Sequence, residues 1–119
     1  MKQPPNKGTP RPEKPEKEKN YETYLMRECT KRDWLCLKGL VQNRKGWPDR
    51  TIITTNRLIV FCEVKRPKGR IAPLQTRTME MLRKRGIPAF IVRDKEDIDR
   101  LITWIEDALP TEDVPDPCH

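Results

Sequence analysis

The sequence predicts an α/β fold in which a mixed β-sheet is flanked by helices, with elements in the order α-β-β-β-α-β-α. Two consecutive segments, the β-branched residues 50–55 and the apolar residues 58–65, are separated by a short polar pair, which is typical of an antiparallel hairpin. A segment of helical periodicity then separates residues 58–65 from another apolar segment at residues 88–92. Such a strand–helix–strand unit crosses over right-handedly and makes its two strands parallel, so the sheet is expected to be mixed.

Composition along the chain indicates where this domain begins and ends. The chain has 119 residues and 12 prolines, and the prolines concentrate before residue 16 and after residue 109. Segments of this kind lack the apolar groups that would offset the entropy of ordering them. We therefore expect a disordered Lys/Glu/Pro-rich leader over residues 1–20, one domain over residues 21–109, and a disordered acidic, Pro-containing tail over residues 110–119.

The first elements have clear local signals. Asn20 is a candidate N-cap for a helix that runs to about Arg32. The apolar residues 34–41 are interpreted as a strand, and a polar loop over residues 42–48 leads into the hairpin. The second hairpin strand is apolar on both faces apart from Glu63, as expected for a strand that is buried on both sides.

The second half of the domain has equally clear boundaries. Pro73 suits the first turn of a helix that continues to about Arg85, and Gly86 is well placed to end it. Residues 88–92 form a short apolar strand. Asp94 is then expected to cap a final helix whose apolar residues recur at helical period.

The net charge of the chain indicates which kinds of partner it could bind. A net charge of +7 and a pI near 9.4 favour a polyanion, and nucleic acid is the first candidate. A basic protein without an anionic partner is the alternative. No apolar run is long enough to span a bilayer and no secretory signal is present, so we expect no membrane partner and a cytoplasmic location, in the host cytoplasm if the protein is viral.

The cysteines do not indicate a structural zinc site. Four cysteines and one histidine are present, no CxxC pair occurs, and the histidine is the last residue. Zinc sites of this kind use closely paired ligands. Because nothing indicates secretion, free thiols are expected, with Cys62 in the core.

The pattern Glu63-Val64-Lys65 is the first candidate for chemistry, because it places two charges at the end of the most apolar strand. Side chains alternate between the faces of a strand, so Glu63 and Lys65 project together while Val64 points the other way. A simple ion pair at a strand exit is the alternative interpretation.

Asp49 strengthens the interpretation of this pattern as a site. A turn at Asn56-Arg57 would place Asp49 opposite Val64, next to Glu63 and Lys65. Two adjacent carboxylates suit Mg²⁺, which retains several waters, with Mn²⁺ as a substitute, and the backbone carbonyl of Val64 is a further candidate ligand. A plain turn residue after proline is the alternative for Asp49.

These residues resemble the VRR-NUC family of the PD-(D/E)xK nuclease superfamily, in particular its stand-alone, phage-like minimal domains. The resemblance covers about residues 21–100 and implies a restriction-endonuclease-like fold. Its motifs are Gly46-Trp-Pro-Asp-Arg50, Phe61-Cys-Glu-Val-Lys-Arg66, Pro73-Leu-Gln75, and Gly86 before the apolar strand.

The resemblance also implies roles for individual residues. Asp49 and Glu63 would bind the divalent metal, Lys65 would be the catalytic lysine, and Gln75 would lie near the substrate phosphate or metal. A helical glutamate ahead of the core is typical, and Glu22 is the best match, with Glu28 and Glu18 as weaker candidates. Alternatively, Glu22 only favours the helix dipole and Gln75 only faces solvent.

Basic residues flank the predicted site on both sides and could hold phosphates without reading sequence. A solvated surface charge is the alternative for each one. Trp47 could stack on a base or pack in the core. No base-reading motif is present, so structure-selective binding is favoured. The candidate nucleic-acid contacts are Arg44, Lys45, Arg50, Arg66, Lys68 and Arg70.

Together these features predict a Mg²⁺-dependent nuclease that hydrolyses phosphodiester bonds, with DNA favoured over RNA as the substrate. A structure-selective endonuclease similar to junction resolvases is the first hypothesis, and a homodimer would supply the two sites needed to cut two strands. An exonuclease or nickase of the same fold is an alternative. A non-catalytic nucleic-acid-binding or replication accessory protein is another.

Overall fold

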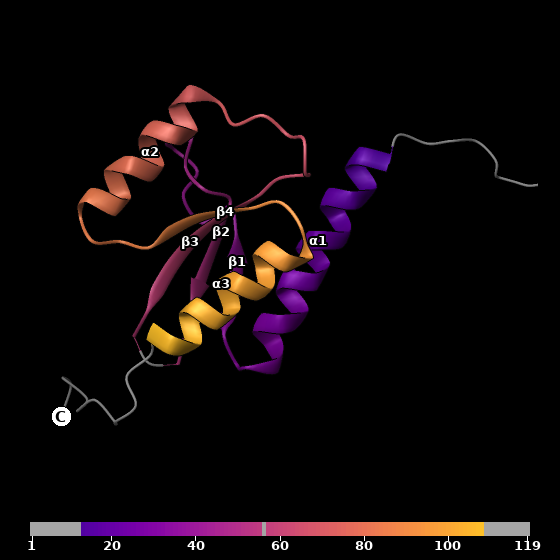
Figure 1. Ribbon diagram of the computed structural model, residues 1–119. Helices are drawn as coiled ribbons and strands as arrows, with labels where there is room; N and C mark the ends of the chain where they lie inside the picture. The colour runs from indigo at the N-terminus through magenta and orange to yellow at the C-terminus, as the bar shows by residue number, and fades with distance from the viewer. Residues whose placement is uncertain (1–12, 56, 109–119) are drawn as a thin grey trace, which may run out of the picture.

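The computed structural model describes residues 13–55 and 57–108 of the chain (Figure 1). The element order is α-β-β-β-α-β-α, which confirms the order predicted from the sequence. The elements are α1 (Glu13–Lys31), β1 (Leu35–Lys38), β2 (Arg50–Ile53), β3 (Ile59–Val64), α2 (Pro73–Lys84), β4 (Ala89–Val92) and α3 (Lys95–Ala108).

The four strands form one mixed sheet in the order β1-β2-β3-β4. β1 pairs with β2 and β2 pairs with β3 in antiparallel fashion, as expected for strands joined by short loops. β3 and β4 are parallel, because α2 carries the chain from the end of one strand back to the start of the next. The mixed α/β sheet predicted from the sequence is therefore confirmed.

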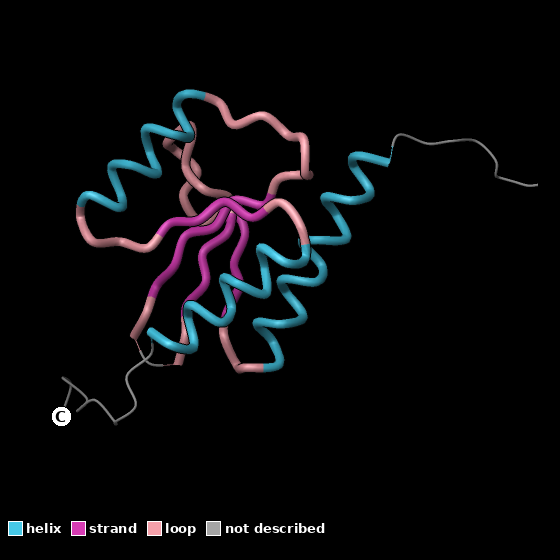
Figure 2. The backbone as a smooth tube through the Cα atoms, in the orientation of Figure 1, coloured by secondary structure: helices cyan, strands magenta, loops and turns pink. Residues whose placement is uncertain are grey.

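Helices cover both faces of this sheet (Figures 1 and 2). α1 and α3 lie on one face, where Val60, Cys62 and Val64 of β3 point into the larger core cluster. α2 lies on the other face, where Phe61 packs against a smaller cluster around Met79. Since side chains alternate along a strand, Glu63 points to the α2 face.

The register of the β2–β3 hairpin differs from the prediction by one residue. Arg50 pairs with Cys62, and the backbone N–H of Thr54 donates to the carbonyl of Leu58 over 3.0 Å. Thr54 and Leu58 are therefore the residues that pair next to the turn, and Arg57 has a φ of 70°, which suits a hairpin loop one residue longer than predicted. As a result Asp49 comes opposite Glu63, not opposite Val64.

α1 begins earlier than expected. The helix starts at Glu13, not after Asn20, so residues 13–20 are helical and do not belong to a disordered leader. Lys and Glu are good helix formers, and Pro15 falls in the first turn, where its missing N–H costs no intrahelical hydrogen bond. The expectations for residues 1–12 and 110–119 concern parts of the chain outside the described residues.

The ends of α2 and α3 follow the expected signals, whereas β1 ends at Lys38, before Gly39 with its φ of 65°, and does not extend to residue 41 as expected. Gly86, with a φ of 76°, follows the last turn of α2. At the start of α3 the Asp97 N–H donates to Asp94 Oδ1 over 2.8 Å, while the Arg93 N–H donates to Asp97 Oδ2 over 2.9 Å. None of the described helices has the length and apolar character needed to cross a bilayer.

Candidate active site

Glu63 and Lys65 lie together at the end of β3, on the face covered by α2. Lys65 Nζ is 3.5 Å from Glu63 Oε2, and the Glu63 side chain is 13% exposed. Burial raises the pKa of the Glu63 carboxyl, although the Asp49 N–H and Lys65 act in the opposite direction. The Lys65 N–H donates to the carbonyl of Val92 over 2.9 Å, so parallel pairing with β4 positions the lysine backbone.

Asp49 joins this pair from the neighbouring strand. Its backbone N–H donates to Glu63 Oε1 over 2.9 Å, which fixes the orientation of the Glu63 carboxylate. The Asp49 carboxylate is 43% exposed, so it remains accessible. Asp49, Glu63 and Lys65 are therefore brought together, as the sequence predicted, with a register one residue different.

The loop before Asp49 depends on Gly46. This residue has a φ of 80°, and a Cβ atom added to it would lie 2.7 Å from Leu74 Cγ and 3.0 Å from the Leu74 carbonyl oxygen. Glycine therefore lets the loop lie against the start of α2. Trp47 packs edge-to-face on Phe61, with ring centroids 5.5 Å apart, so of the two roles considered for Trp47 the structure supports packing.

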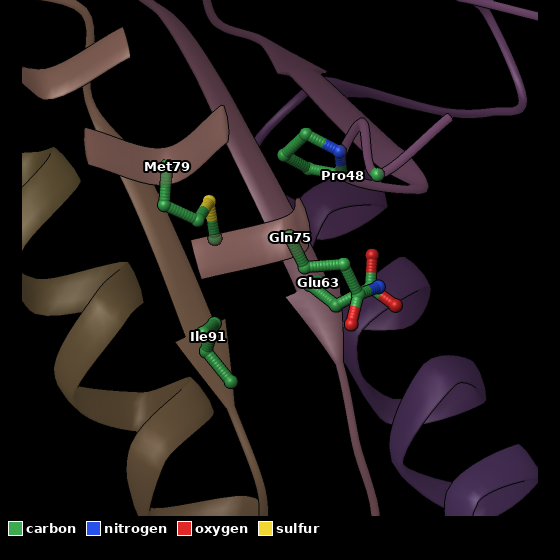
Figure 3. A pocket seen from close by; sticks show the side chains of 6 residues that line it. Pro48, Glu63, Gln75, Met79 and Ile91 are labelled. Atoms are coloured by element: carbon green, nitrogen blue, oxygen red, sulfur yellow. The ribbon is translucent and has the colours of Figure 1, made fainter. Parts of the chain in front are cut away.

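Gln75 lies beside Glu63, in the first turn of α2. Both residues line a small pocket together with Gly46, Pro48, Met79 and Ile91. The ends of the Gln75 and Glu63 side chains lie next to each other in Figure 3. Gln75 Oε1 accepts the Ala72 N–H over 3.1 Å, which holds the side chain at the start of the helix. Gln75 is thus a pocket residue and does not point away into solvent.

Glu22 reaches the site from α1, on the opposite face of the sheet. Its Oε1 is 2.7 Å from Arg50 Nη2 and 3.7 Å from Lys38 Nζ. Lys38 Nζ is in turn 3.8 Å from Asp49 Oδ2, so one ammonium links the two carboxylates around the end of β1. The weaker candidate Glu28 pairs with Lys31 and Arg32 instead.

Lys38 is the residue that the sequence reasoning missed. It is the last residue of β1 and pairs in register with Arg50, the first residue of β2. The Gly39 N–H donates to the Asp49 carbonyl over 2.9 Å, which ties the end of β1 to the site. A charged residue at the end of a strand adjacent to Asp49 was the available signal, but its use requires knowing that β1 pairs with β2.

The residues at the site fit a divalent cation held by two carboxylates. Within residues 13–55 and 57–108, no three His, Cys, Asp or Glu side chains are grouped to hold a metal ion. Mg²⁺ in proteins is commonly bound by one or two carboxylates plus waters and substrate phosphates, which matches the oxygen donors of Asp49 and Glu63. The Val64 side chain packs in the core and has no donor atom. Its backbone carbonyl is therefore the group that could serve as a ligand.

Comparisons with known proteins identify the family of this chain. A family model described as the VRR-NUC domain matches residues 11–96. The chain belongs to the VRR-NUC family. A solved structure described as a VRR_NUC domain is 32% identical and superimposes with a TM-score of 0.68, covering 73% of this chain and 95% of that chain. No curated protein matches.

Membership of VRR-NUC confirms the family and the fold inferred from the sequence motifs. VRR-NUC is a nuclease-type family, which implies a nucleic acid as the substrate. The matched range contains Asp49, Glu63, Lys65 and Gln75 and also extends upstream to residue 11, close to the start of α1. Most of α3 lies beyond the matched range.

The basic residues of this VRR-NUC domain divide into two groups. Arg50 is 6% exposed and pairs with Glu22, so the expectation that it contacts phosphate at the surface is wrong. Its guanidinium instead neutralises Glu22 inside the fold. The other candidates lie at the surface or are half-buried: Arg44, Lys45, Arg66, Lys68 and Arg70.

Arg93 organises the basic loop that follows Lys65, a role that sequence reasoning also missed. Its Nη1 donates to the carbonyl of Gly69 over 2.6 Å and lies 3.3 Å from the carbonyl of Arg66. The Gly69 N–H also donates to the Arg66 carbonyl over 2.8 Å, closing a tight turn. The loop of residues 66–70 is therefore held against the end of β4.

Proposed function

We propose that this VRR-NUC domain is a Mg²⁺-dependent DNA nuclease, specifically a structure-selective endonuclease similar to junction resolvases. The observation that carries the proposal is the position of the Glu63 carboxylate. It lies between the backbone N–H of Asp49 and the ammonium of Lys65, with the exposed Asp49 carboxylate beside it. Two acids can hold a divalent ion, and a lysine beside them can stabilise the charge that develops during phosphodiester hydrolysis.

Asp49 and Glu63 would hold the ion, with Mn²⁺ as a substitute for Mg²⁺. When bound, the ion supplies charge neutralisation for the phosphodiester and lowers the pKa of its water. The protein contributes the orientation of the two carboxylates. The Asp49 N–H holds Glu63 Oε1 over 2.9 Å, and Lys65 Nζ lies 3.5 Å from Oε2, so an ion bound there would share the Glu63 carboxylate with Lys65.

Lys65 is assigned two roles. It would position the attacking water, and it would stabilise the negative charge that develops on the phosphate. Its Nζ is close enough to Glu63 to lie beside a cation held there, and its backbone is fixed by β4. Preorganised positive charge of this kind stabilises the transition state without reorganisation. Gln75 is assigned to positioning the phosphate or a water at the mouth of the same pocket.

The surface around the site favours a substrate that is recognised by its backbone and shape. Exposed cations on both sides, Arg44 and Lys45 before the site and Lys68 and Arg70 after it, suit phosphate contacts. None of these positions supplies a base-reading helix, which supports structure selectivity. Cleavage of both strands of a junction requires two such sites, so the proposal includes a homodimer.

The test is a cleavage assay on end-labelled linear, flapped and four-way DNA with Mg²⁺, Mn²⁺ or EDTA. Lys65→Ala and Glu63→Gln should each lower the rate by about 100-fold or more, since removal of one preorganised group has effects of this size. Lys84→Ala, an exposed lysine at the end of α2, is the matched control and should cleave normally. Cleavage that survives EDTA or Lys65→Ala would overturn the proposal.

A second candidate function is nucleic-acid binding without cleavage. It is favoured by the absence of any three-ligand metal group among the described residues. The same panel distinguishes the two candidates, because a binding protein would shift the DNA without producing fragments. Fragment lengths separate the remaining alternatives: an exonuclease yields ladders from the ends, and a nickase cuts one strand only.

A further inference from the structure

An open cavity of about 340 Å³ lies between α1 and the start of α3. We propose that it binds an unpaired nucleotide of a single-stranded DNA segment that leaves the active site. The inference rests on the proposed nuclease function and adds a second contact surface for the same substrate. The lining residues are Asn20, Tyr21, Thr23, Tyr24, Arg27 and Lys95.

The chemistry of the lining is that of a single-strand binding surface. Both tyrosines of the chain are in it, together with two cations and no acidic side chain. Among the described residues, neither Arg27 nor Lys95 forms an ion pair, so both charges are available to phosphate. Proteins bind single strands by stacking bases on aromatic rings while cations follow the backbone.

Tyr24 is held rigidly enough to serve as a stacking surface. Its hydroxyl donates to Asp99 Oδ1, its ring packs against the core, and Lys95 Nζ is 5.2 Å from the ring centroid. The bond to Asp99 raises the pKa of Tyr24 to about 12 and fixes the orientation of the phenol. A ring fixed in advance loses little conformational entropy when a base stacks on it.

The cavity lies at the same end of the sheet as the candidate active site. Glu22, which is linked through Lys38 to Asp49, belongs to the same turns of α1 as the lining residues. Lys95 begins α3 three residues after Val92, whose carbonyl accepts the Lys65 N–H. Figure 1 shows the start of α3 beside α1. A strand that leaves the site can therefore reach the cavity along α1.

The first test compares two double variants of the full chain that lose the same charge. Arg27→Gln/Lys95→Gln removes the cations of the cavity, whereas Lys84→Gln/Arg85→Gln removes two exposed cations at the end of α2. Binding of fluorescent single-stranded and blunt duplex DNA is measured in EDTA over a salt series. For single strands each phosphate contact contributes about 0.7 to the slope of log K against log salt, so the cavity variant should lose about 1.4.

The control variant should lose much less slope on the single strand, and neither variant should change duplex binding appreciably. An equal loss of slope in both double variants would show that the effect comes from net charge alone, and it would overturn the inference. An unchanged slope in the cavity variant would also overturn it.

The second test locates the contact directly by photo-cross-linking wild-type protein to a single-stranded oligonucleotide containing 5-iodouracil. Trypsin releases residues 20–27 as one peptide that contains both tyrosines, and the adduct should map to it. An adduct confined to the loop of residues 66–70 would overturn the inference. If the adduct is absent but Mg²⁺-dependent cleavage persists, the cavity is excluded and the nuclease stands. An adduct without cleavage would exclude the nuclease activity and leave the contact at the cavity standing.

Discussion

Gly46 lets the loop before Asp49 lie close against Leu74 at the start of α2. A Cβ atom there would meet both the side chain and the backbone of Leu74, and the backbone has a positive φ. Gly46→Ala should therefore lower the free energy of unfolding by about 2–4 kcal/mol, combining overpacking with the left-handed conformation. The cleavage rate should fall by more than the loss of folded protein explains, because the same loop carries Asp49.

The matched control is Gly86→Ala. Gly86 has a φ of 76°, but a Cβ atom there would meet nothing within 4 Å. Only the conformational cost of about 1–2 kcal/mol is expected, with normal cleavage by the folded protein. Thermal unfolding and cleavage rates measure both variants. Equal losses in the two would show that the contact with Leu74 does not matter.

Cys36 should be the most reactive thiol among the described cysteines. A hydrogen bond from Cys29 lowers the pKa of Cys36, and the positive charge of Arg50 acts in the same direction against the effect of burial. The pKa values of Cys29 and Cys62 are raised, for Cys62 chiefly by burial. Since the thiolate is the nucleophile, a lowered pKa means that Cys36 reacts at a lower pH than an ordinary thiol.

Iodoacetamide labelling across a pH series, followed by mass spectrometry of the separate peptides, checks this order. The midpoint for Cys36 should lie below the ordinary thiol value of 9.0. Arg50→Lys, which keeps the charge next to Glu22, should leave the midpoint low. Labelling of Cys62 as fast as Cys36 would contradict the prediction.

At the residue scale, the sequence was sufficient to predict where the side chains of β3 point. It was insufficient to predict the contacts of the residues around them. Glu63 and Lys65 could be placed on one face because alternation along a strand is a local rule. The roles of Lys38 and Arg50 depend on the β1–β2 register and on contacts between the sheet and α1. Contacts of that kind are set by tertiary packing, which no local pattern encodes.

At the element scale, the loop of residues 66–70 should depend on Arg93. The guanidinium binds the Gly69 and Arg66 carbonyls, so Arg93→Gln removes the main bond between this loop and β4. We expect faster amide hydrogen exchange in residues 66–70 and weaker DNA binding, with kcat at saturating DNA little changed. Arg93 is thus expected to position basic residues rather than take part in the reaction.

Arg100→Gln provides the control for this variant. Arg100 is exposed and, within the described part of the chain, forms its ion pair with Asp97 across one helical turn, so its loss should leave exchange in residues 66–70 unchanged. An unchanged exchange rate in Arg93→Gln as well would contradict the role assigned to Arg93. A fall in kcat with unchanged DNA binding would contradict it too.

The elements that were predicted best are those with strong signals at both ends. Pro73 and Gly86 bound α2, and Asp94 caps α3, because these residues determine backbone conformation locally. The predicted start of α1 was wrong because a Lys/Glu-rich segment suits both a solvated coil and a helix. The hairpin register was wrong because sequence alone did not distinguish a two-residue loop from a three-residue loop.

At the scale of the whole molecule, the two layers differ in how much core they contain. The layer of α1 and α3 buries residues from both helices and three strands, whereas α2 rests on a small cluster of Met79, Leu82 and Ala89 with partly buried neighbours. Regions with fewer buried apolar contacts open at lower free energy. α2 should therefore open locally without global unfolding.

Native-state hydrogen exchange in low denaturant tests this difference. Amides of α2 should exchange with lower opening free energies than those in the second half of α1 or in α3. Leu82→Ala should lower the opening free energy of α2 by about 2–5 kcal/mol. Identical opening free energies in all three helices would show that the sheet and both layers unfold as one unit.

The hydrogen bond from Asp49 to Glu63 has a consequence for how the proposed nuclease would bind a cation. It leaves few anionic oxygens for the ion, so water and the DNA itself must complete the coordination. We expect weak binding of Mg²⁺ to the free protein and tighter binding once a phosphate is present. By reciprocity the ion would then tighten binding of DNA to the proposed nuclease by the same factor, which titrations of Mg²⁺ with and without DNA would measure.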